Sequence, residues 1–313
     1  MDETVIQQQI ISDLTGTQKK ISSVLFYDAA GSTLFERITT LPEYYLTKTE
    51  IGLLHQAATS LPYTDHQTTI VEFGSGDCTK ISILLEAITK QQRKQICYMP
   101  VDISRDAIEK SSYLLSKRFP EISIHGIIAD FLTQLHVISH HTPTIWCFLG
   151  STIGNLSMDD ALLFLQQLSK QMHQGDILLL GLDMVKQTHI LEQAYNDSQL
   201  VTEQFNKHIL TVVNDRIHTC FDPETFDHVA FYNTSDSRIE MHLKATQDMF
   251  ITSPLLSKPL SLKKGETIHT ENSHKFTPKH IAWFAESTGL DIEQLYTDDQ
   301  HWFSLVQFQK NSP

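Results

Sequence analysis

The residues best suited to chemistry lie where short apolar runs of the sequence end. Gly74 and Gly76 follow the run TTIVEF, while Asp102 and Asp130 close two later runs. Glycines at such a turn can adopt positive φ and let the backbone approach a ligand closely. An acid after a strand can bind ribose hydroxyls, and a second carboxylate can accept a hydrogen bond from an exocyclic amine. Together these positions predict a site for a nucleoside cofactor.

Phe131 directly follows Asp130, so its ring could pack on the adenine of such a cofactor. The glycine loop is not the dinucleotide fingerprint GxGxxG, because Thr79 stands at the third glycine position. A GxG turn alone equally fits an ordinary strand-to-helix connection, and a lone acid equally fits a helix cap. Three such features at three consecutive strand ends favour a cofactor. Without the dinucleotide loop, S-adenosylmethionine (SAM) fits better than NAD.

To bring these residues together, the chain must alternate strands with helices. Helical patterns separate five apolar runs that predict strands: TTIVEF, ICYMPVDIS, ISIHGIIADF, TIWCFLGSTIGN and GDILLLGLDM. This alternation predicts the α/β class, with a mostly parallel sheet whose ligands bind at the carboxyl ends of the strands. We expect this domain to span 56–195 and 276–313, where a helix at PKHIAWFAESTG and a strand near WFSLVQF complete it.

Two regions break the alternation and predict a second domain. Residues 1–55 have a polar-amphipathic helical pattern, and 196–275 contain the helical segment TEQFNKHILTVVNDRI. Antiparallel strands are expected after this helix, around VAFYNTS, RIEMHLKAT and GETIHTENSHKF. We therefore expect 1–55 and 196–275 to form an α+β domain.

The composition excludes several classes of function. The 313 residues are 41% hydrophobic and 19% charged with a formal net charge of −13, which favours a folded protein that repels nucleic acid and anionic membranes. No apolar run approaches the roughly 18 residues of a membrane span, and no signal peptide is indicated. His136 and His140 have the spacing of metal ligands, but no third ligand is evident, so we expect no metal. We expect a cytoplasmic monomer with reduced cysteines.

The chain resembles the histidine Nα-methyltransferases of ergothioneine biosynthesis, a family that includes related fungal amino-acid N-methyltransferases. The matching segments cover nearly the whole chain in the family's order: FYDAAGSTLFERITTLPEYYLTKTE, VEFGSG, PVDIS, FLGSTIGNL, AYNDSQLVTEQFN, IEMHL and HTENSHKF. The resemblance implies a Rossmann-like methyltransferase domain with an inserted substrate-binding domain, and SAM as cofactor. It also implies successive methylation of L-histidine to Nα,Nα,Nα-trimethylhistidine (hercynine).

The resemblance also implies roles for individual residues. Cofactor contacts are expected from Gly74, Ser75, Gly76, Lys80, Asp102, Asp130, Phe131 and Gly150. Contacts to the amino-acid end of the substrate are expected from Tyr45, Asn155 and Tyr195, and contacts to its side chain from Met241, Glu271 and Ser273. Tyr27 could act as a base for the amine or hold a water, and Lys80 could instead be a helix-surface lysine. Ser151 departs from the family, which usually has a second glycine there.

These residue types agree with the implied chemistry. Methyl transfer to nitrogen needs a deprotonated amine and in-line positioning, and little further bond-making help. The Asn155 amide can donate to a carboxylate and accept from an amine, while tyrosines donate without adding a cation that would repel the sulfonium. Glu271 and Ser273 stand two apart, on one face of a strand, and suit imidazole better than indole. The alternatives are another amino-acid substrate, or a binding module without catalysis, whose mark would be a lost cofactor loop or a lost Asn155.

Overall fold

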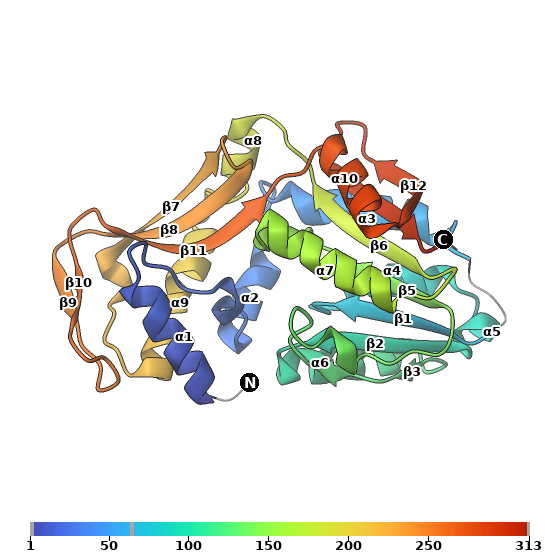
Figure 1. Ribbon diagram of the computed structural model, residues 1–313, viewed down its shortest axis with the longest axis horizontal. Coiled ribbons are helices and arrows are strands. Elements are labelled where there is room, and N and C mark those ends of the chain that lie inside the picture. Colours follow the sequence, from blue (N-terminus) through green and yellow to red (C-terminus); the bar gives the residue numbers. More distant parts are fainter. Residues whose placement is uncertain (1–2, 63–65, 312–313) are drawn as a thin grey trace. The chain divides into compact units, whose positions relative to one another are not determined.

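The computed structural model describes residues 3–62 and 66–311 (Figure 1). The chain forms two compact units: a large unit of Leu46–Val185 and His274–Pro313, and a small unit of Met1–Tyr45 and Lys186–Ser273. The boundaries between the units at 45/46 and 185/186 come ten residues before the boundaries expected at 55/56 and 195/196. The helix over 45–58 contributes to the core of the large unit, whereas the helix over 188–193 contacts a strand of the small unit.

An eight-stranded sheet runs through the large unit (Figure 1). Its order is β12-β13-β6-β5-β1-β2-β3, and β4 also pairs with β2. All pairs among β1 to β6 are parallel, whereas β13 runs antiparallel to both β6 and β12. The strands are β1 (Thr68–Phe73), β2 (Ile96–Asp102), β3 (Ser123–Ile124), β4 (Ile127–Ile128), β5 (Thr144–Phe148), β6 (Ile177–Asp183), β12 (Asp291–Thr297) and β13 (Phe303–Gln309). The expected Rossmann-like α/β class is confirmed.

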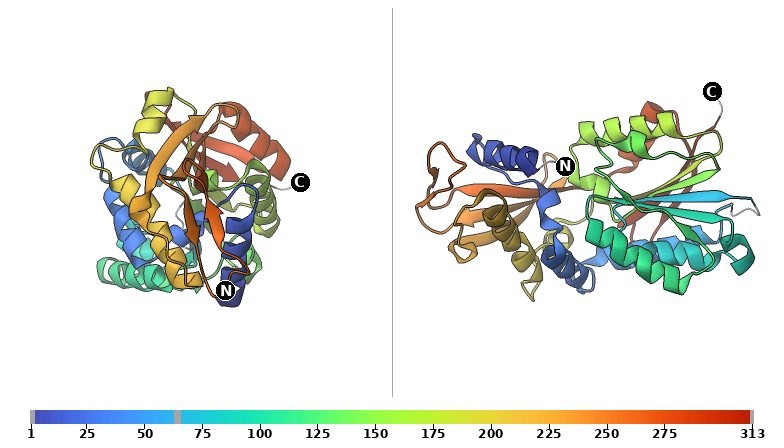
Figure 2. Two further views of the ribbon diagram at one scale, coloured as in Figure 1. Left: turned by 90° about the vertical axis from the view of Figure 1, so that its left-hand side faces the viewer. Right: turned by 90° about the horizontal axis from the view of Figure 1, so that it is seen from below.

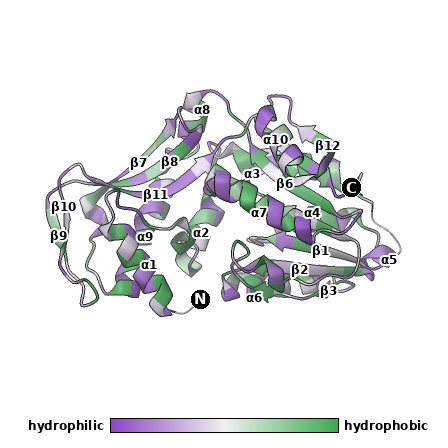
Figure 3. Ribbon diagram, viewed as in Figure 1, coloured by the Kyte–Doolittle hydropathy of each residue, from purple (hydrophilic) through white to green (hydrophobic). Residues whose placement is uncertain are grey.

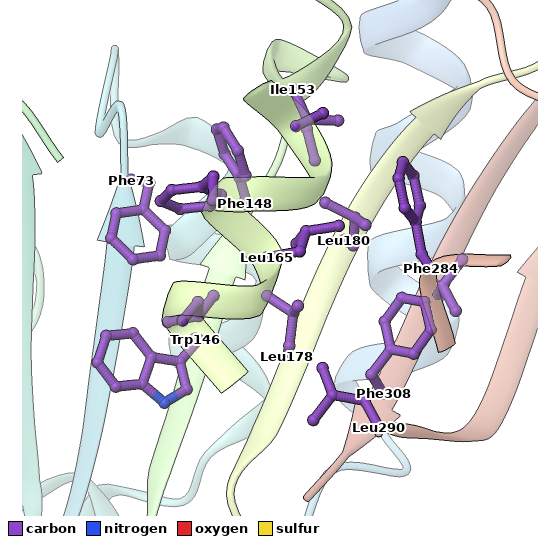
Figure 4. Packing of buried hydrophobic residues seen from close by; sticks show 14 of the residues in the cluster. Phe73, Trp146, Phe148, Ile153, Leu165, Leu178, Leu180, Phe284, Leu290 and Phe308 are labelled. Carbon is purple, nitrogen blue, oxygen red and sulfur yellow. The ribbon is translucent and has the colours of Figure 1, made fainter. Parts of the chain in front are cut away.

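Helices cover both faces of this sheet, which explains why its central strands are buried and rich in apolar residues (Figures 2 and 3). Every residue of β1, β5 and β6 is buried. On one face, Leu165 and Phe284 of two helices pack toward Leu180 of β6 (Figure 4). The helices are α3 (Tyr45–Ala58), α4 (Thr79–Ala87), α5 (Lys90–Arg93), α6 (Arg105–Arg118), α7 (Met158–Gln171) and α10 (Pro278–Thr288), with 3-10 turns η2 (Leu135–Val137) and η3 (Thr152–Asn155).

The strand order contains one reversal that positions a ligand site. From β1 the chain moves outward to β2 and β3, and it then returns to place β5 on the other side of β1. In open α/β sheets, ligands bind outside the carboxyl ends of the strands at such a switch point. The loops after β1 and β5 therefore flank the place where a ligand is expected.

The small unit combines helices with antiparallel strands. Its main sheet has the order β11-β8-β7, and β9 and β10 form a separate pair. The elements are α1 (Glu3–Thr15), η1 (Ser23–Phe26), α2 (Ala29–Ile38), α8 (Thr188–Gln193), α9 (Val201–Ile217), η4 (Pro223–Thr225), β7 (Phe226–Asn233), β8 (Arg238–Ala245), β9 (Met249–Ile251), β10 (Leu260–Leu262) and β11 (Thr267–His274). The helix and the three longer strands expected here are confirmed, while the short β9–β10 pair was not foreseen.

Two details of the large sheet differ from the sequence-based prediction. The single strand expected over ISIHGIIADF is split into β3 and β4. Gly126 lies at the break, and a Cβ there would be 2.4 Å from Ile108 of α6, so a helix packs directly on the backbone. The edge strand β12 was missed because it is mostly exposed and its residues are mostly polar. Within the described residues, no helix is both long and apolar enough to cross a bilayer.

Candidate active site

The loop after β1 has the backbone geometry that its glycines predict. Gly74 and Gly76 have φ of 69° and 50°, in the region that favours glycine. The Gly74 N–H donates to the carbonyl of Val101 at 2.9 Å, which ties the loop to the end of β2. Between the glycines, the buried Ser75 Oγ has no hydrogen-bond partner among the described residues. A buried hydroxyl without a partner is costly, so this loop offers a polar atom for a ligand.

Asp102 ends β2 beside that loop. Its carboxylate accepts a hydrogen bond from the Ser104 N–H at 2.9 Å. Burial raises the pKa of Asp102, and the backbone N–H groups of Ser104, Ile103 and Ser75 oppose that rise. The structure therefore brings Asp102 and Ser75 together, as expected for two contacts to one cofactor.

Asp130 and Phe131 follow β4 at the same edge. The Ala129 N–H donates to the Asp102 carbonyl at 3.0 Å, which joins the ends of β2 and β4. Asp130 also caps the next turn, because its carboxylate accepts from the Leu132 N–H at 3.0 Å and from Thr133 Oγ1 at 2.9 Å. The cap and the cofactor contact are compatible, since a carboxylate has about four acceptor positions.

The Phe131 ring forms part of an aromatic cluster. Its centroid lies 5.3 Å from that of Phe73, 5.5 Å from that of Phe148 and 5.8 Å from that of Phe164. The ring is only partly buried against this core. Its neighbours fix the ring at the carboxyl edge of the sheet, where it can form an apolar wall for a base.

Gly150 and Lys80 lie together at the switch point. Gly150 follows β5 with φ of 77°, and a Cβ there would be 2.9 Å from Lys80 Nζ. The Lys80 ammonium lies 2.7 Å from a carboxylate oxygen of Glu50, and the Gly150 N–H donates to the other oxygen at 2.6 Å. The alternative of a helix-surface lysine is thus wrong, because the Lys80 side chain is only 23% exposed. Sequence reasoning missed Glu50, whose signal is an acid before the apolar residues IGLL.

Two further residues of the loop after β5 bear on the site. Ser151 has φ of 54°, which explains why glycine suits this position, and its Oγ accepts from the Asp183 N–H at 2.9 Å. Asn155 ends η3 and is half-buried. No hydrogen bond joins its side-chain amide to another of the residues described in the structure, so the amide can serve a substrate.

In the small unit, three of the expected substrate residues line one cavity. The cavity has a volume of about 20 Å³, and its lining residues are Phe35, Ile38, Tyr44, Ala194, Tyr195, Thr202, Phe205, Met241 and Glu271. This volume holds roughly one water molecule. A substrate side chain would require a lining residue to move, and the flexible Met241 is suited to that.

Ser273 joins the same group through Tyr195. The Tyr195 hydroxyl donates to Ser273 Oγ at 2.8 Å, and both residues are buried. The intervening Asn272 does not line the cavity and pairs with the His269 ring, at 2.9 Å from its Nε2. Glu271 therefore lines the cavity together with Tyr195, and Ser273 accepts a hydrogen bond from Tyr195.

The two remaining tyrosines have different neighbours. The Tyr27 ring lies edge-on to Phe35 and Phe205, with centroids 5.7 and 6.1 Å apart, so it packs on two side chains that line the cavity. Tyr45 is buried, and the Lys186 ammonium donates to its hydroxyl at 2.7 Å and lies 4.4 Å from its ring centroid. A cation thus accompanies Tyr45, whereas the sequence argument favoured tyrosine as a donor because a cation would repel the sulfonium. Lys186 gave no signal in the sequence.

Two groups of potential metal ligands are better explained as hydrogen-bond networks. The fold brings His140 together with His173 and Asp176, and His136, the partner that its spacing indicated in the sequence, is not part of this group. The Asp176 carboxylate, however, already accepts from His140 and from the backbone N–H groups of His173 and Thr144.

In the second group, which joins Glu240 to His242 and His269, the carboxylate is likewise engaged. Glu240 accepts from Arg238 at 2.7 Å, from Asn233 at 2.8 Å and pairs with His242 at 3.0 Å. The neighbouring guanidinium opposes a further cation, and neither group is assigned a metal.

A buried acid inside β1 is a further feature that sequence reasoning passed over. Glu72 accepts a hydrogen bond from the Tyr98 hydroxyl, and burial raises its pKa to about 8. The hydrogen bond from Tyr98 and the charge of Lys80 oppose that rise. The signal in the sequence is an acid within an otherwise apolar run, VEF.

Comparison with known proteins gives a consistent result. The chain matches the family described as histidine-specific methyltransferase, SAM-dependent, over residues 6–310. It is 35% identical to the histidine N-alpha-methyltransferase of Mycolicibacterium smegmatis over 96% of this chain and 93% of that protein. The corresponding protein of Mycobacterium tuberculosis is 33% identical over 96% of this chain and 93% of its own. The fold is similar to that of a mitomycin 7-O-methyltransferase, with a TM-score of 0.51, 12% identity, and coverage of 99% of this chain and 68% of that one.

Proposed function

This chain belongs to the family of SAM-dependent, histidine-specific methyltransferases, and from that premise we propose that it methylates the α-amino nitrogen of L-histidine. Three successive transfers would yield Nα,Nα,Nα-trimethylhistidine. The observation that supports this best is the cavity of the small unit, where Glu271 lies among apolar side chains with Tyr195 and Met241. A carboxylate in an apolar pocket selects a substrate that brings an N–H group.

The residues at the carboxyl edge of the large sheet fit SAM. Ser75 presents a buried hydroxyl that lacks a partner in the described part of the chain, and Gly150 leaves space that a Cβ would fill. We propose that Gly74, Ser75 and Gly76 follow the amino-acid part of SAM and that Asp102 binds the ribose hydroxyls. SAM supplies a methyl group on a positively charged sulfur.

Asp130 and Phe131 are proposed to hold the adenine. Asp130 would accept a hydrogen bond from the exocyclic amine while it keeps its cap, and Phe131 would pack on the ring. The remaining cofactor contacts of the proposal are Lys80 and Gly150.

Glu271 and Ser273 are proposed to bind the two nitrogens of the imidazole. Glu271 can accept from the ring N–H. Ser273 already accepts from Tyr195, and a hydroxyl that accepts can still donate its own hydrogen to the second ring nitrogen. This pairing requires a neutral imidazole with one donor and one acceptor, a pattern that indole lacks.

The amino-acid end of the substrate is proposed to bind Tyr45, Asn155 and Tyr195. Asn155 would accept from the amine and donate to the carboxylate, so its role is to aim the nitrogen lone pair at the methyl group. The Tyr195 hydroxyl donates to Ser273 here and would have to change partner to reach a carboxylate. Tyr27 remains a candidate to hold a water that takes the amine proton.

One assay tests the proposal. The purified protein is incubated with SAM and each of the twenty amino acids, and the products are identified by mass spectrometry. We expect mono-, di- and trimethylated histidine, with no comparable product from tryptophan or phenylalanine. Preferential methylation of another amino acid would replace histidine as the substrate, and no methylation of any amino acid would refute the proposed activity.

A further inference from the structure

Glu50 of α3 is a buried carboxylate to which the proposed function gives no role. Its side chain is 1% exposed. One oxygen accepts from the Gly150 N–H at 2.6 Å, and the other lies 2.7 Å from the Lys80 ammonium. A buried charge is strongly unfavourable unless it is paired and hydrogen-bonded, so these two partners account for its presence.

The surrounding backbone is shaped to admit this ion pair. A Cβ on Gly181 of β6 would lie 2.2 Å from the Glu50 Oε1 atom, and a Cβ on Gly150 would lie 2.9 Å from Lys80 Nζ. Both distances are too short for a side chain to be accommodated without movement. Gly181 in β6 and Gly150 in the loop after β5 therefore leave the space in which the carboxylate and the ammonium meet.

The ion pair lies where the cofactor is expected. Lys80 is in the first turn of α4, just after β1, and Gly150 directly follows β5. These two strands are neighbours in the sheet and flank the switch point. One carboxylate thus holds two of the proposed cofactor contacts, one from each side of the switch point.

We propose that Glu50 is a positioning residue of the cofactor site that also sets its charge, and this inference rests on the proposed function. Glu50 fixes Lys80 and the Gly150 N–H and neutralises the ammonium, so that the site accepts the positive sulfonium of SAM. SAM and its product S-adenosylhomocysteine (SAH) differ only in the methyl group and the charge on sulfur. Loss of a purely structural residue should weaken both ligands equally, whereas loss of a negative charge should weaken SAM more.

The experiment measures the dissociation constants of SAM and SAH by calorimetry for the full-length wild type and for Glu50→Gln. Glutamine keeps an oxygen that can accept from Gly150, while it removes the charge. We expect the Kd of SAM to rise roughly tenfold more than that of SAH, the effect of one nearby buried charge. The matched control is Glu86→Gln, which removes an exposed carboxylate paired with Arg118 on the same unit and should change neither Kd.

A second variant should shift the ratio of the Kd values of SAM and SAH in the opposite direction. Lys80→Met removes the positive partner and leaves Glu50 unneutralised, so the ratio of the two Kd values should shift toward SAM. Equal weakening of SAM and SAH in Glu50→Gln, or shifts of the same sign in both variants, would overturn the inference. The proposed function fails separately: a protein that binds SAM but methylates no amino acid would refute it and still allow the ratio to be measured.

Discussion

Replacement of Glu271 by alanine should remove the preference for histidine and leave SAM binding intact. Glu271 is half-buried and lines a cavity with Phe35, Ile38 and Met241, so a hydrogen bond to its carboxylate is made in apolar surroundings. A hydrogen bond to a charged group contributes about 1.5–3 kcal/mol. Since about 1.4 kcal/mol corresponds to tenfold, kcat/KM for histidine should fall roughly 10- to 150-fold.

Apolar amino acids should respond differently. A polar pocket discriminates mainly by penalising ligands that leave its groups unpaired. Removal of the carboxylate removes that penalty, so phenylalanine and tryptophan should lose far less than histidine, and the flexible Met241 can repack around a larger ring. Glu271→Gln keeps an acceptor without the charge and should give an intermediate loss for histidine.

The assay is kcat/KM for histidine, phenylalanine and tryptophan in the wild type and both variants, with the Kd of SAM measured in parallel. Glu266→Gln is the matched control, because Glu266 precedes β11, pairs with Lys19 and does not line the cavity. An equal fall in kcat/KM for all three amino acids would mean that Glu271 supports the fold or the binding of the substrate's α-amino and carboxylate groups. The assignment of the side-chain pocket would then be refuted.

Three further outcomes follow from the large unit. Asp102→Ala should weaken SAM binding by about 1–3 kcal/mol in calorimetry, the cost of unmet polar partners, and an unchanged Kd would remove Asp102 from the site. Glu72 has a pKa raised to about 8, so its contribution to stability is present below pH 4.5, its ordinary value, and is lost as the pH rises through 8. Glu72→Gln should therefore raise Tm relative to the wild type more at about pH 8.5 than at about pH 5, and a pH-independent difference would contradict this. Gly181→Ala should lower Tm because its Cβ would lie 2.2 Å from Glu50, and adding Glu50→Ala should restore part of the loss; no recovery would show that the clash is not with that carboxylate.

Local sequence patterns were sufficient to predict the fold class and most elements. Apolar runs such as ILLLGLD form a strand only when both faces of the sheet are covered, so the run itself predicts burial. The split of the third strand and the exposed strand β12 were not predictable in this way. The first depends on how α6 packs against Gly126, and the second depends on pairing with β13 rather than on its own apolar character.

Gly74, Gly76, Asp102, Asp130 and Phe131 could be foreseen because they lie at the ends of strands, and the carboxyl ends of parallel strands share one edge. The resemblance to a known family was needed for Lys80 and Gly150. It was also needed for Tyr195, Met241 and Ser273, since no local pattern marks a half-buried tyrosine or a methionine. The structure then joined Tyr195 to Ser273 and placed Met241 with Glu271 in one cavity. The cofactor, substrate and catalytic roles themselves remain predictions.

The sequence by itself determined the alternation of strands and helices, the glycine loop and the acids at strand ends, because these depend on neighbours close in the chain. Only the tertiary structure decided which buried charges meet. Glu50 and Lys80 are thirty positions apart, and the backbone N–H of Gly150, in the loop after β5, also donates to Glu50. Lys186 reaches Tyr45 in the same way. Such contacts depend on the packing of distant segments, where the cost of burying a charge selects a partner that no local pattern specifies.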